Sequence, residues 1–320
     1  MWSDRRVERS LGVVACLVLA VILGMIAFVV SKAWPSFAGN GLHWFGSGGN
    51  VDQQLQDIFN SPADPEAYEY AIRTWPLLWG TAVTTIGGVG LGLVLAILAA
   101  VFIVEFAPRR LQRVLEPVVR LLAAVPSVLY GLIGVLVLVP WVGEHLISAE
   151  RKESVAYVVQ LSGASISVAI VILCVMVTPI MVAIIVDALR AVPSTWTEGA
   201  AALGANRWRV MLTIAVRAAR PAIIAAAVLA TARALGEAIM LSMVSGSVGF
   251  APNPIDGITF FFEPTRPLAA TIVDNREGLS IEPFGQTIYA FAAVLLVSSM
   301  ALSWIGWAAK QPLRRYGVQG

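Results

Sequence analysis

Six apolar runs, each long enough to cross a lipid bilayer, dominate this sequence of 320 residues. A membrane-spanning helix needs about 17–25 mainly apolar residues to cross a hydrocarbon layer ~30 Å thick. The candidate spans are 11–31, 75–104, 119–142, 158–186, 221–245 and 284–307. Since 58% of the residues are hydrophobic and only 13% are charged, we predict an all-α membrane protein with six transmembrane helices, and a soluble enzyme is excluded.

The charges between the runs predict the orientation. Fifteen of the 22 Lys and Arg residues lie at the N-terminus, in 105–120, in 187–220 and at the C-terminus. Segments rich in basic residues remain on the cytoplasmic side of a membrane. We therefore expect a multi-pass protein of the cytoplasmic (inner or plasma) membrane with both termini cytoplasmic, in contact with lipid along its spans.

Several functional classes are disfavoured by what the sequence lacks. Its two cysteines, Cys16 and Cys174, lie inside apolar runs, so we expect two free, buried thiols and no metal site. The basic residues form no single stripe, so nucleic acid is not an expected partner. No G-x-x-x-x-G-K-[ST] phosphate-binding loop occurs in the sequence, which predicts that the chain is not itself an ATPase and holds no cofactor of its own.

The loop 190–220 is too ordered in pattern to be a simple connector. Thr195 and Glu198 have the spacing of a capping box, and Gly204 can end a helix in a left-handed conformation. Asn206 can then cap a second helix. This second helix has one apolar stripe, made of Trp208, Leu212 and Ala215. Two short amphipathic helices between spans are suited to docking a soluble protein.

This loop resembles the coupling loop of membrane permeases of ATP-binding-cassette (ABC) importers. Their pattern is Glu-Ala-Ala, three residues, Gly, nine residues and Ile-x-Leu-Pro, and Glu198, Ala200, Gly204 and Ile214 match it by position. Where the pattern has Ala, Leu and Pro, this chain has Gly199, Val216 and Arg217. The resemblance implies a type I ABC-importer permease fold, in which this loop seats in a cleft of an ATPase subunit that binds ATP and magnesium.

Two charged residues interrupt the fifth apolar run. Arg233 and Glu237 are four residues apart, so on a continuous helix they leave the same face and can pair. A charge inside a membrane is costly unless it is paired or hydrated. One reading is a structural ion pair that fixes helix packing. The other is a water-filled pathway in which Arg233 binds an anion and Glu237 neutralises the arginine when the site is empty.

The segments around these charges resemble phosphate-uptake permeases of the ABC-importer class. The carrying residues are 232–238 (Ala-Arg-Ala-Leu-Gly-Glu-Ala), 125–131 (Val-Pro-Ser-Val-Leu-Tyr-Gly) and a long outer loop after the first span. The resemblance implies import of inorganic phosphate. It also implies as partners a second homologous permease, two ATPase subunits and an extracytoplasmic phosphate-binding protein. Ser127, beside an expected kink at Pro126, is a further candidate for the substrate pathway.

Alternatives to phosphate stay open at this point. An arginine in a membrane recognises negative charge, so sulfate, molybdate or a phosphonate are other candidate substrates. A secondary anion transporter working without ATP is a rival from another class.

The chain divides into three predicted parts. These are 1–73 (first span and extended outer loop), 74–310 (permease domain with the coupling loop 190–220) and 311–320 (cytoplasmic tail). Gly87, Gly88, Gly90 and Gly92 in the second span predict close helix packing, with a second permease as a candidate neighbour.

Overall fold

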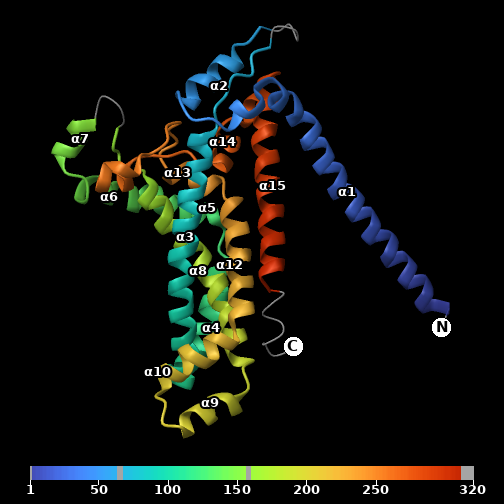
Figure 1. The fold of residues 1–320 in the computed structure, drawn as a ribbon, viewed down its shortest axis with the longest axis vertical. Coiled ribbons are helices and arrows are strands. Elements are labelled where there is room, and N and C mark those ends of the chain that lie inside the picture. Colours follow the sequence, from blue (N-terminus) through green and yellow to red (C-terminus); the bar gives the residue numbers. More distant parts are fainter. Residues whose placement is uncertain (1, 63–67, 156–159, 311–320) are drawn as a thin grey trace. The chain divides into compact units, whose positions relative to one another are not determined.

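The computed structural model describes residues 2–62, 68–155 and 160–310 (Figure 1). The regular secondary structure of these residues is helical, and apart from one isolated bridge between Gly246 and Thr265 they contain no β-structure. Five helical segments within them are long and apolar enough to span a membrane: Val7–Phe45, Trp75–Phe106, Ser127–His145, Ile166–Arg190 and Phe284–Ala309. If the bent pair Arg207–Ala218 and Arg220–Leu235, whose helices meet at 70°, is taken as one span, the number rises to six. The all-α prediction is confirmed, and five to six candidate spans are found where six were predicted. The predicted tail 311–320 lies outside the described residues.

The chain forms two compact units. One comprises Met1–Thr74 and Asn275–Leu296, and the other comprises Trp75–Asp274 and Val297–Gly320. The last long helix, α15 (Phe284–Lys310), contributes to both.

The first unit contains the long helix α1 (Trp2–Asn40), the 3-10 turn η1 (Gly41–Phe45), the helix α2 (Val51–Phe59), the short turn η7 (Arg276–Gly278) and the start of α15. Its centre is the fully buried Trp44, whose ring lies 4.9 Å from that of Phe37 and 6.0 Å from that of Phe291. The Lys32 ammonium lies 3.1 Å from Glu282 and holds the pKa of that carboxyl below its ordinary value. Cys16 is exposed on α1 and not buried as expected, because apolar side chains along this helix face outward, as lipid permits.

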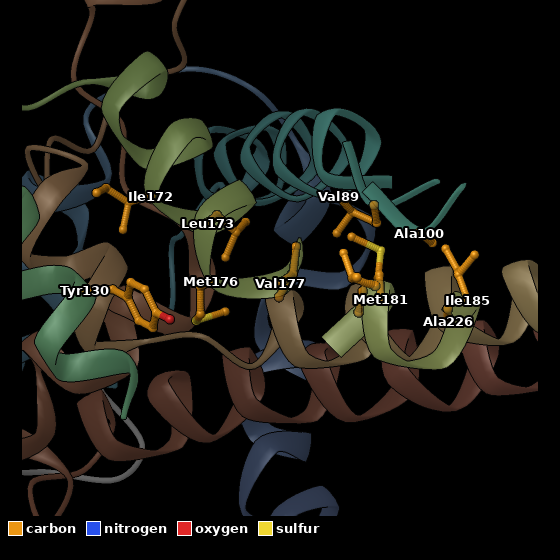
Figure 2. Close-up of a cluster of buried hydrophobic side chains, with 14 of the residues drawn as sticks. Val89, Ala100, Tyr130, Ile172, Leu173, Met176, Val177, Met181, Ile185 and Ala226 are labelled. Carbon is orange, nitrogen blue, oxygen red and sulfur yellow. The ribbon is translucent and has the colours of Figure 1, made fainter. Parts of the chain in front are cut away.

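The second unit is built around α8 (Ile166–Arg190). Its other elements are α3 (Trp75–Val101), α4 (Arg109–Ala123), α5 (Ser127–Ile133), α6 (Val139–His145), α7 (Ala149–Val155), α9 (Ser194–Ala202), α10 (Arg207–Val210), α11 (Val216–Ala218), α12 (Arg220–Leu235), α13 (Ile239–Val244), α14 (Leu268–Asp274), the π turns η3 (Phe102–Phe106), η4 (Gly134–Leu138) and η5 (Met211–Ala215), and the 3-10 segment η6 (Pro254–Phe262). The helices α3, α4 and α12 pack directly on α8. Figure 2 shows the core that results, with Met176 and Met181 of α8 among side chains from α3, α5 and α12.

Small residues on α3 allow its close approach to α8. A Cβ atom added at Gly88 would lie 2.9 Å from Leu173 Cδ2 and 3.0 Å from Leu173 Cβ, and one added at Gly92 would lie 3.0 Å from Met181 Cε. Close contact between small residues and a neighbouring helix replaces the hydrophobic driving force that is missing in lipid. The predicted packing role is therefore confirmed for these glycines, with α8 of the same chain as the neighbour. A Cβ at Gly90 would meet nothing within 4 Å.

The predicted third span, 119–142, is wrong in its first part. The helix α4 ends at Ala123 and a separate helix, α5, begins at Ser127 with Pro126 as its N-cap. Proline offers no amide hydrogen and disfavours helical geometry in the residue before it. The expected kink is thus a complete break.

The fourth and fifth spans also have different bounds from those predicted. The fourth begins at Ile166 because the chain turns at Gly163, whose φ of +101° favours glycine. A Cβ there would also lie 2.8 Å from the amide nitrogen of Gly143. The fifth, predicted as 221–245, begins with Pro221 in the first turn of α12, as expected, but breaks between Leu235 and Ile239.

Candidate functional site

The segment from α9 to α11 has the helix, turn, helix form predicted for the loop 190–220. Helix α9 ends at Ala202, and Gly204 follows with a left-handed φ of +82°. The amide of Gly204 donates to the Ala201 carbonyl at 2.9 Å, and the amide of Ala205 donates to the Ala200 carbonyl at 3.2 Å. These two bonds form a Schellman motif. The role of Gly204 as a helix stop is therefore confirmed.

The two predicted caps have different outcomes. The side chain of Asn206 accepts a hydrogen bond of 2.8 Å from the Arg209 amide, so this residue caps the second helix as predicted. The capping box at Thr195 is wrong. Helix α9 begins at Ser194, two residues earlier than a cap at Thr195 would place it, with Pro193 as its N-cap and no side-chain capping bond. Proline before Ser194 sets the start of the helix, and Glu198 is left exposed.

The apolar stripe predicted for the second helix is also shifted. The π turn η5 follows α10, and a π turn rotates the residues after it relative to an α-helix. The buried residues are consequently Val210, Met211 and Ala215, whereas Trp208 and Leu212 are partly exposed. Ile214 is half-buried on the same turn.

The segment 194–218, from α9 to α11, is named the docking segment. Two contacts attach it to η3, the turn that continues α3. The Arg207 Nε atom lies 3.6 Å from Glu105 Oε1, and the rings of Trp208 and Phe106 lie 6.0 Å apart. Leu203, at the tip between the helices, is 90% exposed. The tip between the two helices is therefore exposed and apolar, while the helical pair itself is capped and attached to the helical stretch that ends at Phe106.

Arg233 and Glu237 do not form the ion pair expected from their spacing. The break after Leu235 separates them, since Arg233 lies on α12 and Glu237 lies between α12 and α13. Glu237, 8% exposed, accepts a hydrogen bond of 3.2 Å from the Met240 amide through Oε1. Within the described residues no ion pair joins the two side chains. The prediction of a structural ion pair between Arg233 and Glu237 assumed one continuous helix, and it is wrong because the helix breaks between them.

The half-buried Arg233 reaches instead to the carboxyl end of α4. Its Nη1 atom donates to the Ala123 carbonyl at 3.4 Å, and the Tyr130 hydroxyl donates to the neighbouring Leu122 carbonyl at 3.0 Å. Last-turn carbonyls of a helix carry partial negative charge and lack partners within the helix. Among the residues that the structure describes no carboxylate forms an ion pair with Arg233, so its positive charge is not compensated there.

Two helix breaks therefore lie together. Helices α5 and α13 pack on each other, and a Cβ at Gly131 would lie 3.1 Å from Met240 Cα. The contact of Arg233 with Ala123 joins the break before α5 to the break after α12. Irregular backbone at membrane depth is tolerated where protein buries it or where it lines a hydrated cavity. Ser127, half-buried at the start of α5, lies next to the first break.

The sequence did not indicate Tyr130 or the carbonyl groups of Leu122 and Ala123 as parts of this site. Tyr130 lies inside the segment 125–131, which resembles phosphate-uptake permeases. That resemblance is the feature of the sequence that could have pointed to it. The carbonyls become available only because α4 ends at Ala123, and no side-chain pattern marks a carbonyl acceptor.

Comparisons with known proteins give a consistent result. The model of the family described as binding-protein-dependent transport system inner membrane component matches residues 88–309. The probable ABC transporter permease protein YqgH of Bacillus subtilis is 31% identical over 93% of this chain and 89% of its own length. The probable phosphate transport system permease protein PstC of Methanocaldococcus jannaschii is 30% identical over 80% of each chain. PstC 1 of Mycobacterium tuberculosis, a phosphate transport system permease protein, is 30% identical over 95% of this chain and 91% of its own.

Among solved structures, a chain of the inward-facing MetNI methionine ABC transporter aligns with 74% of this chain and 94% of its own length. Its TM-score is 0.49 and its sequence identity is 16%, a likeness too weak to decide anything by itself.

Proposed function

The chain belongs to the family of binding-protein-dependent transport system inner membrane components and is an ABC importer permease subunit, and from this premise we propose that it carries inorganic phosphate into the cell. The observation that supports an anion as substrate is the half-buried Arg233, which donates to the Ala123 carbonyl beside two helix breaks and has no ion-pair partner in the described part of the chain. The names of the PstC relatives favour phosphate among anions. As a permease subunit of the cytoplasmic membrane, the chain itself catalyses no covalent reaction.

The other subunits of the importer belong to the same proposal. A phosphate-binding protein outside the cell would deliver the ion to a pathway between this chain and a second homologous permease. Two ATPase subunits, with ATP and magnesium, would bind the docking segments, where Glu198, Ala200, Gly204 and Ile214 match the coupling pattern. The contact of Arg207 with Glu105 would carry their movement to α3. The family membership argues against the rival of an anion transporter that works without ATP.

In this proposal Arg233 binds the phosphate by paired charge-assisted hydrogen bonds and Glu237 keeps the backbone turn after α12 in place. Arginine is suited to a tetrahedral oxyanion, because its planar guanidinium presents two parallel donors and stays charged at all working pH values. Glu237 stabilises the turn through its bond to the Met240 amide. The neighbouring hydroxyl of Ser127 is available as a further donor to the ion.

The test is uptake of labelled phosphate by the assembled importer carrying Arg233→Gln, with Arg220→Gln as its control. Both residues lie on α12, but Arg220 is exposed at its first position. We expect Arg233→Gln to lower the uptake rate by about 100-fold, since hydrogen bonds to a charged group contribute ~1.5–3 kcal/mol each. Arg220→Gln should keep most of the rate. Equal loss in both variants, or full uptake in Arg233→Gln, would refute the anion-contact role.

Glu237 is examined by a second pair of substitutions. Glu237→Gln keeps an oxygen that can accept from the Met240 amide, whereas Glu237→Ala removes it. If the residue acts by holding the turn, the Gln variant transports and the Ala variant loses both uptake and thermal stability. If the negative charge itself is needed, both variants lose uptake while the Gln variant keeps its stability.

A further inference from the structure

A groove on α4, separate from the site around Arg233, is rich in arginine. It has a volume of about 780 Å³ and is formed by one face of α4 together with the last residue of α8. Its charged residues are Arg109, Arg113, Glu116, Arg120 and Arg190. The four on α4 are separated by four, three and four residues, so they form one stripe along the helix.

The positive charge of this groove is only partly balanced. Glu116 receives two hydrogen bonds from Arg190, one of them 2.9 Å long, and Arg120 lies 3.3 Å from Asp187. Arg109 and Arg113, one turn apart, have no ion-pair partner in the described part of the chain. Like charges at this spacing destabilise a helix, so a bound anion would relieve a repulsion already present.

The opposite face of α4 indicates where this anion comes from. The exposed apolar residues Leu111, Val114 and Val118 lie across the helix from the arginine stripe. An apolar face is suited to lipid or to the apolar surface of another subunit. The arginine face then points away from the membrane and toward water, which favours a dissolved oxyanion over a lipid headgroup.

The arginine stripe also begins where the Arg233 site ends. Arg233 contacts Ala123, the last residue of α4, and Arg120 precedes it by one turn. At a rise of 1.5 Å per residue, Arg109 to Arg120 cover about 16 Å of helix. They lead toward the end of the unit that carries the docking segment, because Glu105, just before α4, pairs with Arg207. Figure 1 shows α4, α9 and α10 at this end.

We propose that this groove is a release-side site for a phosphate-type oxyanion, which receives the ion after Arg233 and passes it to the cytoplasm. The inference rests on the proposed function and adds to it the inner half of the ion's route. Arg109 and Arg113 are the principal ligands, since their guanidinium groups are available for bidentate bonds. Arg120 and Arg190 contribute charge while they remain paired with carboxylates.

The test uses the complete importer in vesicles made of phosphatidylcholine, with the phosphate-loaded binding protein outside and ATP inside. Arg109→Gln/Arg113→Gln is compared with Arg110→Gln, which removes an arginine of the same helix that does not line the groove. We expect about tenfold slower maximal uptake in the double variant, which corresponds to the loss of about one charge-assisted bond at an exposed, solvent-screened site. The concentration of binding protein that gives half-maximal uptake should not change, because delivery occurs on the other side. Arg110→Gln should stay within about twofold of the unmodified importer.

Other results would overturn the inference in distinguishable ways. If the unmodified importer takes up no phosphate, the proposed function itself fails. If it takes up phosphate and the double variant matches it, only the groove assignment fails. Equal losses in the double variant and in Arg110→Gln would show a general effect of charge and would also refute the groove assignment. If the loss appears only in vesicles that contain phosphatidylglycerol, the groove binds a lipid headgroup and not the transported ion.

Discussion

At Gly88 the absence of a side chain sets the distance between α3 and α8. We predict that Gly88→Ala lowers the free energy of unfolding by about 1–3 kcal/mol, the usual cost of overpacking, because the added Cβ would lie 3.0 Å from Leu173 Cβ. Chemical unfolding in mild detergent, followed by tryptophan fluorescence, measures this change.

Gly90→Ala is the matched control on the same helix, because a Cβ at Gly90 would meet nothing within 4 Å. Its free energy of unfolding should change by less than about 0.5 kcal/mol. Equal destabilisation by both substitutions would mean that α3 does not pack on α8 through Gly88.

Some roles of single residues can be predicted from the sequence, and others cannot. Glycine at 204 and asparagine at 206 have roles that depend only on local backbone geometry, and both roles are present in the structure. The partner of Arg233, by contrast, does not depend on local backbone geometry. It is a backbone carbonyl 110 residues away, and a spacing rule that assumes one continuous helix pairs the arginine with Glu237 instead.

At the scale of elements, the docking segment depends on the left-handed turn that ends α9. We predict that Gly204→Ala weakens binding of the ATPase subunit to the permease by about 5–30-fold, because a left-handed alanine costs roughly 1–2 kcal/mol and the helix end loosens. Surface-plasmon or fluorescence titration of the ATPase against the permease in detergent gives this affinity.

Gly199→Ala serves as the control for that substitution. Gly199 lies within α9, has an ordinary helical conformation and would meet nothing within 4 Å as alanine. It should bind the ATPase as the unmodified chain does, and Gly204→Asn should recover part of the affinity, since asparagine tolerates the left-handed region. Unchanged binding in Gly204→Ala would remove this turn from the coupling mechanism.

Helix bounds were less predictable than helix existence. All six apolar runs correspond to helical segments, because length and hydropathy decide whether a segment can cross a bilayer. The break at 124–126 is determined by proline geometry, and the break at 236–238 is held by a local hydrogen bond from the Met240 amide to the Glu237 carboxylate. Neither cause changes the hydropathy of the segment, so a hydropathy pattern does not predict these breaks.

At the scale of the whole molecule, the predicted grouping of loops has structural support within the second unit. The segments 105–120 and 187–220, both expected in the cytoplasm, are joined by the pairs of Glu105 with Arg207 and Glu116 with Arg190. The side of the membrane on which they lie stays a prediction from charge. Labelling of a cysteine introduced at the exposed Leu203 by an impermeant maleimide should succeed only in inside-out vesicles. Labelling in right-side-out vesicles would reverse the orientation.

The most direct test of the central claim is uptake of labelled phosphate into vesicles that contain this chain with its second permease, ATPase and binding protein. Unlabelled sulfate, molybdate and a phosphonate are added as competitors. We predict uptake that requires ATP and resists excess of all three competitors. Uptake of a competitor in place of phosphate would contradict the assigned substrate, and uptake without the ATPase would contradict the account of the chain as the permease of an ATP-driven importer.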